Sequence, residues 1–319
     1  MLAYVCWEKW QRTPVNPGVD KVTIEIHPGA SGAAIGDLLV ENGIMPSTYH
    51  FVMLCKYKGA LNQLKAGYYE LSGNETPLEI LDAIRTGRIY TWNLIIPEGF
   101  NVKEIDARLS SWQSYPAGSF IEAASETLLL DKFHIPAKSA EGYFFPSTYK
   151  FSKDTPPAQI ALTMIKTFVE RLPSGFDESA QLVGLTRHEA VILASIIEKE
   201  TGAIEERPLI SAVFHNRLKR KMRLQTDPTV IYAIENFDGN LRKKDLEINS
   251  PYNTYKYPGL PVGPICNPGE AALMAAVKPA AVNYLYFVSK GDGSHLFSSN
   301  LVEHNQAVAK YQKRSKNSR

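Results

Sequence analysis

The sequence has few cysteines, no long apolar run and almost no net charge. Three cysteines, Cys6, Cys55 and Cys266, occur in 319 residues without a CxxC pair, which excludes a disulfide scaffold and favours roles as small buried hydrophobic side chains. The 35 Lys and Arg residues nearly balance the 33 Asp and Glu residues, which argues against a dedicated nucleic-acid-binding protein. Because zinc-ligand spacing, GxxxxGK[ST] and GxGxxG motifs are missing from the sequence, it predicts no metal ion and no organic cofactor.

The N-terminal segment, residues 1–20, has two interpretations. Its first seven residues are apolar, but charged residues follow from Glu8 onward. A membrane span needs about 20 apolar residues, and the segment lacks the basic start and the cleavage site of a signal peptide. It is therefore either a frayed terminus or the remnant of a transmembrane anchor.

The first third of the chain repeats one pattern, in which a strand, a break containing proline or glycine, and a short amphipathic helix follow one another. Thr76 and Pro77 fit the N-cap and the first residue of one such helix. The pattern predicts a small α+β module over residues 21–91 and a second region that opens near Trp92. The three strands are predicted at 22–26, 68–71 and 92–96.

From about residue 156 the periodicity becomes mainly helical. One helix opens with a capping box formed by Thr186 and Glu189, and after residue 224 the chain is rich in Pro, Gly, Asn and Tyr. The fold class is therefore predicted to be α+β, with a mixed, largely helical domain and Pro/Gly-rich loops over residues 92–319. Helices are predicted at 160–172, 186–201 and 208–222, and a strand at 284–288.

The most informative helix ends in Glu198, Lys199 and Glu200. Seven of its eight residues from 190 to 197 are apolar, so most of its surface should be buried. At about 100° per residue, Glu200 falls on the apolar stripe, whereas Glu198 points nearly the opposite way. Apolar surroundings and the negative end of the helix dipole raise the pKa of a glutamate, as a general acid at neutral pH requires. Glu200 is therefore the candidate catalytic residue, and an ordinary charged helix end is the alternative.

Other segments combine aromatic rings with amides and hydroxyls. Residues 141–149 hold four aromatic residues and a proline, and residues 224–229 and 252–255 add amides and hydroxyls. Such a mixture suits a polysaccharide groove, although packing of the loops explains it equally well. The basic run at 217–223 is interpreted as a solvated helix face or as a surface that attracts an anionic polymer.

Six segments, in this order, give the chain a specific resemblance. They are EGYFFPSTY at 141–149, ASIIEKET at 194–201, HNRLKRKMRLQTDPTVIYA at 215–233, SPYNTY at 250–255, GLPVGPICNPG at 259–269 and YLYFVSKGDGSHLFSSNLVEHN at 284–305. Together with the strand–helix repeats at 22–110, they make the chain resemble the MltG (YceG-like) family of endolytic murein transglycosylases.

The resemblance implies a bacterial enzyme that cuts peptidoglycan glycan strands internally, between N-acetylmuramic acid and N-acetylglucosamine, and leaves 1,6-anhydromuramic ends. It implies a LysM-like module over residues 21–91 and a catalytic transglycosylase domain over 92–319. It also implies a single N-terminal transmembrane helix, shortened in this chain to residues 1–7, that holds the catalytic domain on the outer side of the plasma membrane. A peptidoglycan synthase is the protein partner that the family suggests.

The glutamate of the family motif corresponds to Glu200, in agreement with the helical geometry. The resemblance implies that this one carboxyl first protonates the glycosidic oxygen and then acts as a base on the muramyl C6 hydroxyl. The further residues predicted to bind the substrate are Gln225, Asp227, Asn253 and Glu198, together with Tyr149 and Tyr252 as stacking surfaces.

Two other functions stay open at the level of the sequence. A muramidase-type hydrolase would pair Glu200 with a second carboxylate, for which Asp227, Glu198 and Glu141 are the candidates. A peptidoglycan-binding scaffold without catalysis would use the N-terminal module for adhesion.

Overall fold

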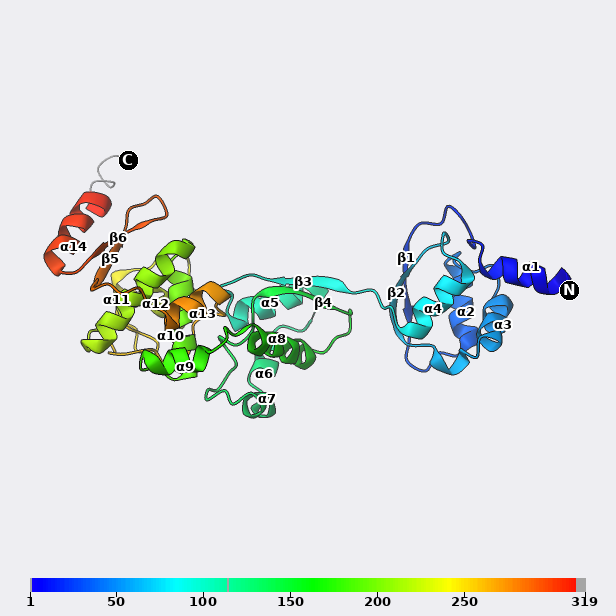
Figure 1. The fold of residues 1–319 in the computed structure, drawn as a ribbon, viewed down its shortest axis with the longest axis horizontal. Coiled ribbons are helices and arrows are strands. Elements are labelled where there is room, and N and C mark those ends of the chain that lie inside the picture. The colour runs from blue at the N-terminus through cyan, green and yellow to red at the C-terminus, as the bar shows by residue number, and fades with distance from the viewer. Residues whose placement is uncertain (1, 114, 314–319) are drawn as a thin grey trace. The chain divides into compact units, whose positions relative to one another are not determined.

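The computed structural model describes residues 2–113 and 115–313 (Figure 1). Contacts between residues divide the chain into two compact units: unit 1 is Met1–Leu94 with Lys150–Thr155, and unit 2 is Ile95–Tyr149 with Pro156–Arg319. The predicted α+β class is confirmed, because in the described residues many helices accompany three two-stranded sheets.

Unit 1 is built on the antiparallel strands β1 (Val22–Ile26) and β2 (Gly67–Leu71), which lie at two of the predicted strand positions. Alternate residues of both strands face a core that includes the fully buried Leu39, Phe51 and Tyr69. The helices of the unit are α1 (Leu2–Gln11), α2 (Gly32–Glu41), α3 (Thr48–Tyr57), the short η1 (Leu61–Gln63) and α4 (Pro77–Thr86).

The N-terminal helix α1 packs on unit 1 and is not frayed. Trp7 and Trp10 stack with ring centroids 4.9 Å apart and lie against the core of the unit. Within the described residues, no single helix is both long and apolar enough to cross a bilayer. Taken together, α9 (Phe176–Leu182) and α10 (Arg187–Glu200) have the length and composition of a span, but a bend of 88° separates them.

The start of α4 confirms the predicted cap. The Thr76 hydroxyl accepts a hydrogen bond from the backbone N–H of Glu79, and the Glu79 carboxylate accepts one from the backbone N–H of Thr76. Pro77 occupies the first helical position, where its missing N–H is not needed. Gly87 ends the helix at φ +75°, a left-handed conformation that favours glycine.

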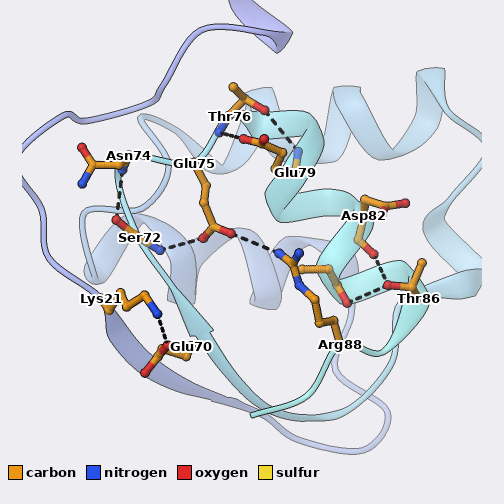
Figure 2. Close-up of polar contacts among 11 residues, drawn as sticks. Lys21, Glu70, Ser72, Asn74, Glu75, Thr76, Glu79, Asp82, Thr86 and Arg88 are labelled. Atoms are coloured by element: carbon orange, nitrogen blue, oxygen red, sulfur yellow. Dashed lines mark hydrogen bonds and ion pairs between the residues drawn. The ribbon is translucent and has the colours of Figure 1, made fainter.

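Charged side chains connect the end of β2 with the segment after α4 (Figure 2). Glu75 accepts hydrogen bonds from the backbone N–H of Ser72 at 2.9 Å and from the Arg88 guanidinium at 3.1 Å. Lys21 forms an ion pair with Glu70 at 2.6 Å. These groups border a hollow of about 770 Å³ on unit 1, and because the cations are well exposed, each pair adds little stability.

A two-stranded sheet joins β3 (Trp92–Ile96) to β4 (Ser147–Phe151). The position of β3 was predicted from the sequence. By contrast, neither β4 nor α3 was predicted, and the residues of β4 belong in part to the aromatic stretch expected to form a loop.

Unit 2 is organised around α10, which packs against the helices α9, α11, α12 and α13. Its residues 190–197 are buried, and Thr186 and Glu189 form the predicted capping box. The helices predicted at 160–172, 186–201 and 208–222 correspond to α8, α10 and α11. Besides α9 and α10, the unit contains α5 (Val102–Gln113), α6 (Ser119–Ala124), α7 (Thr127–Lys132), α8 (Pro157–Arg171), η2 (Ile204–Glu206), α11 (Arg207–Lys219), α12 (Asp227–Ala233), η3 (Lys243–Glu247), α13 (Glu270–Val277), β5 (Tyr286–Ser289), β6 (His295–Ser298), α14 (Leu301–Val308) and η4 (Ala309–Lys313).

Candidate active site

Glu200 is the last residue of α10, and its side chain is partly buried. The backbone turns to an extended conformation at Thr201, so the helix ends at the candidate catalytic residue. The hydroxyl of Thr226 donates a hydrogen bond to Oε1 of Glu200. Thr226 is the N-cap residue of α12, so the start of one helix restrains the carboxyl group at the end of another.

Two buried threonines, Thr229 and Thr254, hold Thr226 in place. Its backbone N–H donates to Oγ1 of Thr254 at 3.1 Å, and its carbonyl accepts from the Thr229 hydroxyl at 2.7 Å. The hydroxyls of Thr229 and Thr254 lie 2.9 Å apart. In the two segments that carry these threonines, the residues predicted to bind the substrate were Gln225, Asp227 and Asn253, so the hydroxyl that contacts Glu200 was missed.

A cavity of about 540 Å³ opens beside Glu200. Gln225 and Asp227 line it together with Glu200, so the structure brings these three predicted site residues together. Other walls come from elements far away in the sequence. They are Arg217 on α11, Tyr255 in the loop before α13, Tyr286 and Phe287 on β5, and His295 on β6.

The surroundings of Glu200 change its acidity in the direction that the sequence predicted. Burial raises the pKa of Glu200 to about 7, and the charge of Asp227 also raises it. The hydrogen bond from Thr226 and the charge of Arg217 lower the pKa but do not cancel the effect of burial. A carboxyl group with a pKa of about 7 can both donate and accept a proton at neutral pH.

Asp227 and Gln225 are exposed at the entrance of α12. Oδ1 of Asp227 accepts a hydrogen bond from the hydroxyl of Tyr255 at 2.5 Å. Gln225 has φ +49°, a left-handed conformation that is uncommon for a residue other than glycine. Such positions cluster at functional sites, and both side chains are accessible to a ligand in the cavity.

Arg217 corrects the interpretation of the basic run as a solvated face. Its Nε donates to the carbonyl of Leu285 at 2.7 Å, and Nη1 donates to the carbonyl of Leu224 at 2.7 Å. The guanidinium lies 5.2 Å from the ring centroid of Tyr286. Arg217 therefore connects α11 to β5 and lines the cavity, whereas the other basic residues of the run are exposed: Lys219, Arg220, Lys221 and Arg223.

Glu198 does not have the surroundings expected of a substrate ligand. Its side chain is 6% exposed and forms an ion pair with Arg207 at 2.7 Å. Its other oxygen accepts from the backbone N–H of Gly269 at 2.9 Å. Burial raises the pKa of Glu198, while Gly269 and Arg207 act in the opposite direction. Through these contacts Glu198 connects α10 to α11 and to the loop before α13, and its contact with the substrate stays a prediction.

The amide of Asn253 likewise forms hydrogen bonds within the protein. Asn253 is fully buried, its Nδ2 donates to the carbonyls of Leu246 and Ile248, and its Oδ1 accepts from the backbone N–H of Tyr255. The side chain therefore organises the loop that carries Tyr255, and its contact with the substrate stays a prediction.

The two tyrosines predicted to stack on sugars also lie outside the described lining of the cavity. Tyr149 is buried on β4, and its hydroxyl donates to the carbonyl of Phe145 at 2.5 Å. The ring of Tyr252 lies 4.8 Å from that of Tyr232. Both rings therefore contribute to packing in this structure.

Glu141, the third candidate for a second carboxylate, lies in the interior of unit 2. It accepts hydrogen bonds from the backbone N–H of Val102, the hydroxyl of Tyr232 and the amide of Asn267. Burial raises its pKa to about 7, and the hydrogen bonds from Val102 and Tyr232 oppose this effect. Glu141 is not among the described residues that line the Glu200 cavity.

The candidate site is thus a single partly buried carboxyl group in a polar and aromatic cavity. Over residues 2–113 and 115–313, no group of three or more His, Cys, Asp and Glu side chains is arranged to hold a metal ion. Fold and site together define an α+β protein with a carboxyl group suited to acid–base chemistry on a polar ligand.

Comparison with known proteins places the chain in a family. Residues 24–310 match the model of the YceG-like family, so the chain belongs to that family. It is 36% identical over 323 residues to the endolytic murein transglycosylase of Bacillus subtilis (strain 168), covering 95% of this chain and 86% of that protein. It is 28% identical to the endolytic murein transglycosylase of Streptococcus pneumoniae (serotype 2, strain D39), covering 93% of this chain and 60% of that protein.

A solved structure supports the same grouping. The crystal structure of a YceG-like protein from Listeria monocytogenes superposes with a TM-score of 0.63 at 32% sequence identity. The superposition covers 90% of this chain and 98% of the other. The family resemblance read from the sequence is therefore confirmed.

Proposed function

We propose that this protein is a peptidoglycan lytic transglycosylase that cuts murein glycan strands internally. The observation that carries the proposal is Glu200, whose burial beside a polar cavity raises its pKa to about 7. Relatives named endolytic murein transglycosylases support the reaction class and the substrate. The lining of the cavity supports a sugar ligand, because it offers the aromatic rings of Tyr286 and Phe287 beside hydrogen-bonding groups.

In the proposed mechanism Glu200 begins protonated. It donates its proton to the glycosidic oxygen while the bond from this oxygen to C1 of the N-acetylmuramic acid unit breaks and C1 gains oxocarbenium character. The N-acetylglucosamine side leaves as an alcohol that carries the donated proton. The resulting carboxylate then removes the proton from the C6 hydroxyl of the same unit, and O6 bonds to C1. The product is a 1,6-anhydro ring, water is not consumed, and Glu200 is protonated again. One carboxyl group is sufficient for both proton transfers because its pKa lies near neutral pH.

Replacing Glu200 with Gln tests this assignment. The amide has nearly the same shape but cannot donate the proton, so we expect turnover of purified glycan strands to fall at least about 100-fold. The matched control is Glu205→Gln, an exposed position that should retain wild-type turnover. Circular dichroism spectra of both variants report whether the fold is intact. Unchanged turnover in Glu200→Gln would contradict the assignment.

A muramidase that pairs Glu200 with Asp227 is the second candidate function. It is favoured by one observation, the presence of both carboxyl groups in the lining of the same cavity. Mass spectrometry of the product ends separates the two reactions, because the lyase leaves anhydromuramic ends and the hydrolase leaves reducing muramic ends. Substitution of Asp227 by Asn should leave the lyase measurable but abolish the hydrolase.

The scaffold without catalysis predicts a different result on purified sacculi. A non-catalytic scaffold would stay bound to the wall and release no soluble fragments. The proposed enzyme releases soluble fragments, and this release requires Glu200. We propose that unit 1 corresponds to the LysM-like module and contributes adhesion to the wall.

We further propose that the protein works in the cell envelope. Because the proposed substrate is murein, we expect the reaction to occur outside the plasma membrane, where an N-terminal anchor would hold the catalytic domain. A peptidoglycan synthase remains the predicted partner, since an internal cut in a new strand needs a polymerase that supplies that strand. Co-purification of the protein from detergent-solubilised membranes with a glycan polymerase is the test of this partnership.

A further inference from the structure

His295, which lines the Glu200 cavity, is paired with a carboxylate. Glu206, at the end of η2, contacts His295, the first residue of β6, although 89 positions separate them in the chain. The backbone N–H of His295 donates to Oε1 of Glu206 at 2.9 Å. Nδ1 of the same ring lies 2.6 Å from Oε2. The side chains are 12% and 15% exposed, so little water competes for either contact.

These two contacts fix the orientation of the imidazole ring. An ionised carboxylate only accepts hydrogen bonds, so Nδ1 must carry a proton. The edge of the ring also packs on Phe287 at 5.5 Å between centroids, with the two planes at 89°. A carboxylate behind a histidine is a common way to fix both its tautomer and its direction.

The opposite ring nitrogen, Nε2, takes no part in the contacts with Glu206. Among the described residues, no group forms a hydrogen bond with Nε2, while His295 lines the same cavity as Glu200. His215 shows a different arrangement, because its Nε2 is buried against the carbonyl of Ala276 and serves packing alone. In the neutral ring of His295, Nε2 carries a lone pair and can accept a hydrogen bond from a sugar hydroxyl or an acetamido N–H.

We propose that Glu206 holds His295 so that Nε2 accepts a hydrogen bond from the N-acetylated sugar bound beside Glu200. This role rests on the proposed function, and it makes His295 a substrate-positioning residue. It requires no change in the proton transfers of Glu200. The sugar unit is held between a fixed acceptor on the β5–β6 hairpin and the carboxyl group at the end of α10.

Two substitutions of His295 separate this role from a purely structural one. Asn places its amide nitrogen near the position of Nδ1, so His295→Asn keeps the contact with Glu206 and removes Nε2. Gln extends to the position of Nε2, so His295→Gln keeps a hydrogen-bonding group for the sugar and loses the contact with Glu206. We expect kcat/KM to fall about 10- to 100-fold in His295→Asn and less than about fivefold in His295→Gln.

A structural role predicts the reverse order, because the hairpin would then depend on the Glu206 contact that only Asn retains. Thermal unfolding measured on both variants corrects the comparison for any loss of folded protein. A kcat/KM of His295→Asn equal to or above that of His295→Gln would overturn the proposal. The matched control is His27→Asn, because Nδ1 of His27 also lies near a carboxylate, 3.1 Å from Glu25, but in unit 1 and at an exposed position. This control should keep wild-type kcat/KM.

The tautomer is measured without any substrate. Nitrogen-15 NMR of the histidine rings should show His295 with a proton on Nδ1 and none on Nε2 at the pH of the assay. In Glu206→Gln, the backbone N–H of His295 still donates to an oxygen, so the amide oxygen of Gln must take the position of Oε1. The amide N–H₂ then takes the position of Oε2 and faces Nδ1. The proton should then move to Nε2, and kcat/KM should fall although the fold is kept. A wild-type ring without a proton on Nδ1, or with one on Nε2, contradicts the proposal.

Assays of Glu200→Gln in parallel keep the two proposals apart. If Glu200→Gln retains turnover, the assignment of Glu200 fails, and if the wild type shows no turnover, the proposed function fails. If Glu200→Gln is inactive while His295→Asn keeps full kcat/KM, only the role of His295 fails.

Discussion

The ionisation of Glu200 depends on a single neighbouring hydroxyl as well as on burial. Thr226 donates to the carboxylate and thereby favours its charged form, which lowers the pKa from the value that burial alone would give. Any change at Thr226 should therefore alter the pH range in which Glu200 carries the proton that the first step requires.

Thr226→Val should move the alkaline limb of the pH–rate profile to higher pH. Valine is close to threonine in shape but cannot donate, so the pKa of Glu200 rises above its wild-type value of about 7. Activity that needs protonated Glu200 is lost as the pH rises through that pKa, so the loss begins later in the variant. Initial rates from pH 5 to 9 measure the shift, and Thr226→Ser, which keeps the hydroxyl, is the control. An alkaline limb at the same pH in all three proteins would contradict this dependence.

Glu141 should make unit 2 less stable as the pH rises. Burial raises the pKa of Glu141 to about 7 in the folded protein, whereas an unfolded glutamate titrates near its ordinary value of 4.5. The folded state therefore binds the proton more tightly, and this contribution to stability is complete below pH 4.5 and lost as the pH rises through 7.

Glu141→Gln removes this dependence. The free energy of unfolding of wild type minus that of Glu141→Gln should decrease between pH 5 and pH 8, because only the wild-type carboxyl must ionise in the interior. Urea denaturation of both proteins at three pH values measures the difference. A difference that grows with pH would show that the hydrogen bonds to the ionised form outweigh its burial.

At the scale of residues, the sequence identified Glu200 but only part of its surroundings. Helical periodicity places Glu200 on the buried stripe, and this information is local. Thr226, Arg217 and His295 reach the same cavity through tertiary packing, which no local pattern encodes. Glu198 was assigned to the substrate because its partner Arg207 lies beyond the end of the helix, where periodicity gives no information.

At the scale of elements, α10 is the part of the molecule on which the site depends. Its first turn is closed by the capping box of Thr186 and Glu189, its middle is buried, and its last residue is Glu200. A change at the beginning of this helix therefore acts on stability, and a change at its end acts on chemistry.

Thr186→Ala should lower the stability of unit 2 by about 1 kcal/mol, the usual effect of losing an N-cap hydroxyl. Thr76→Ala removes the same type of capping box from α4 and is expected to act on unit 1. Scanning calorimetry with activity assays distinguishes them, because Thr186→Ala should lower the temperature at which glycan cleavage is lost. An equal effect of both variants on that temperature would contradict separate roles for the two helices.

Elements with strong local signals were predicted from the sequence, and those without such signals were not. The strands at β1, β2 and β3 and the caps of α4 and α10 follow from alternation and from Thr–x–x–Glu spacing. The start of α3 lacks this spacing, because His50 stands three residues after Ser47, and its N-cap Ser47 makes no side-chain hydrogen bond. β4 is a strand only because β3 pairs with it, which is a contact between distant segments.

At the scale of the whole molecule, a net charge of +2 should make catalysis insensitive to salt. Proteins that bind through many ion pairs lose affinity steeply as salt screens them. Here the proposed ligand groups are mostly neutral, so we expect kcat/KM on glycan strands to change less than about threefold between 0.05 and 0.5 M NaCl. A loss greater than about tenfold would indicate that exposed cations such as Lys219 and Lys221 bind the substrate.

The pairing of Glu206 with His295 also sets an order of events during synthesis. A ribosome makes Glu200 and Thr226 well before it makes the β5–β6 hairpin, and the hairpin must then dock on a helical core that is already in place. A nascent chain that ends before residue 295 thus carries the acid without its complete cavity. Full activity should appear only once the chain extends past β6 to α14, because Leu301, His304 and Asn305 of α14 also line the cavity.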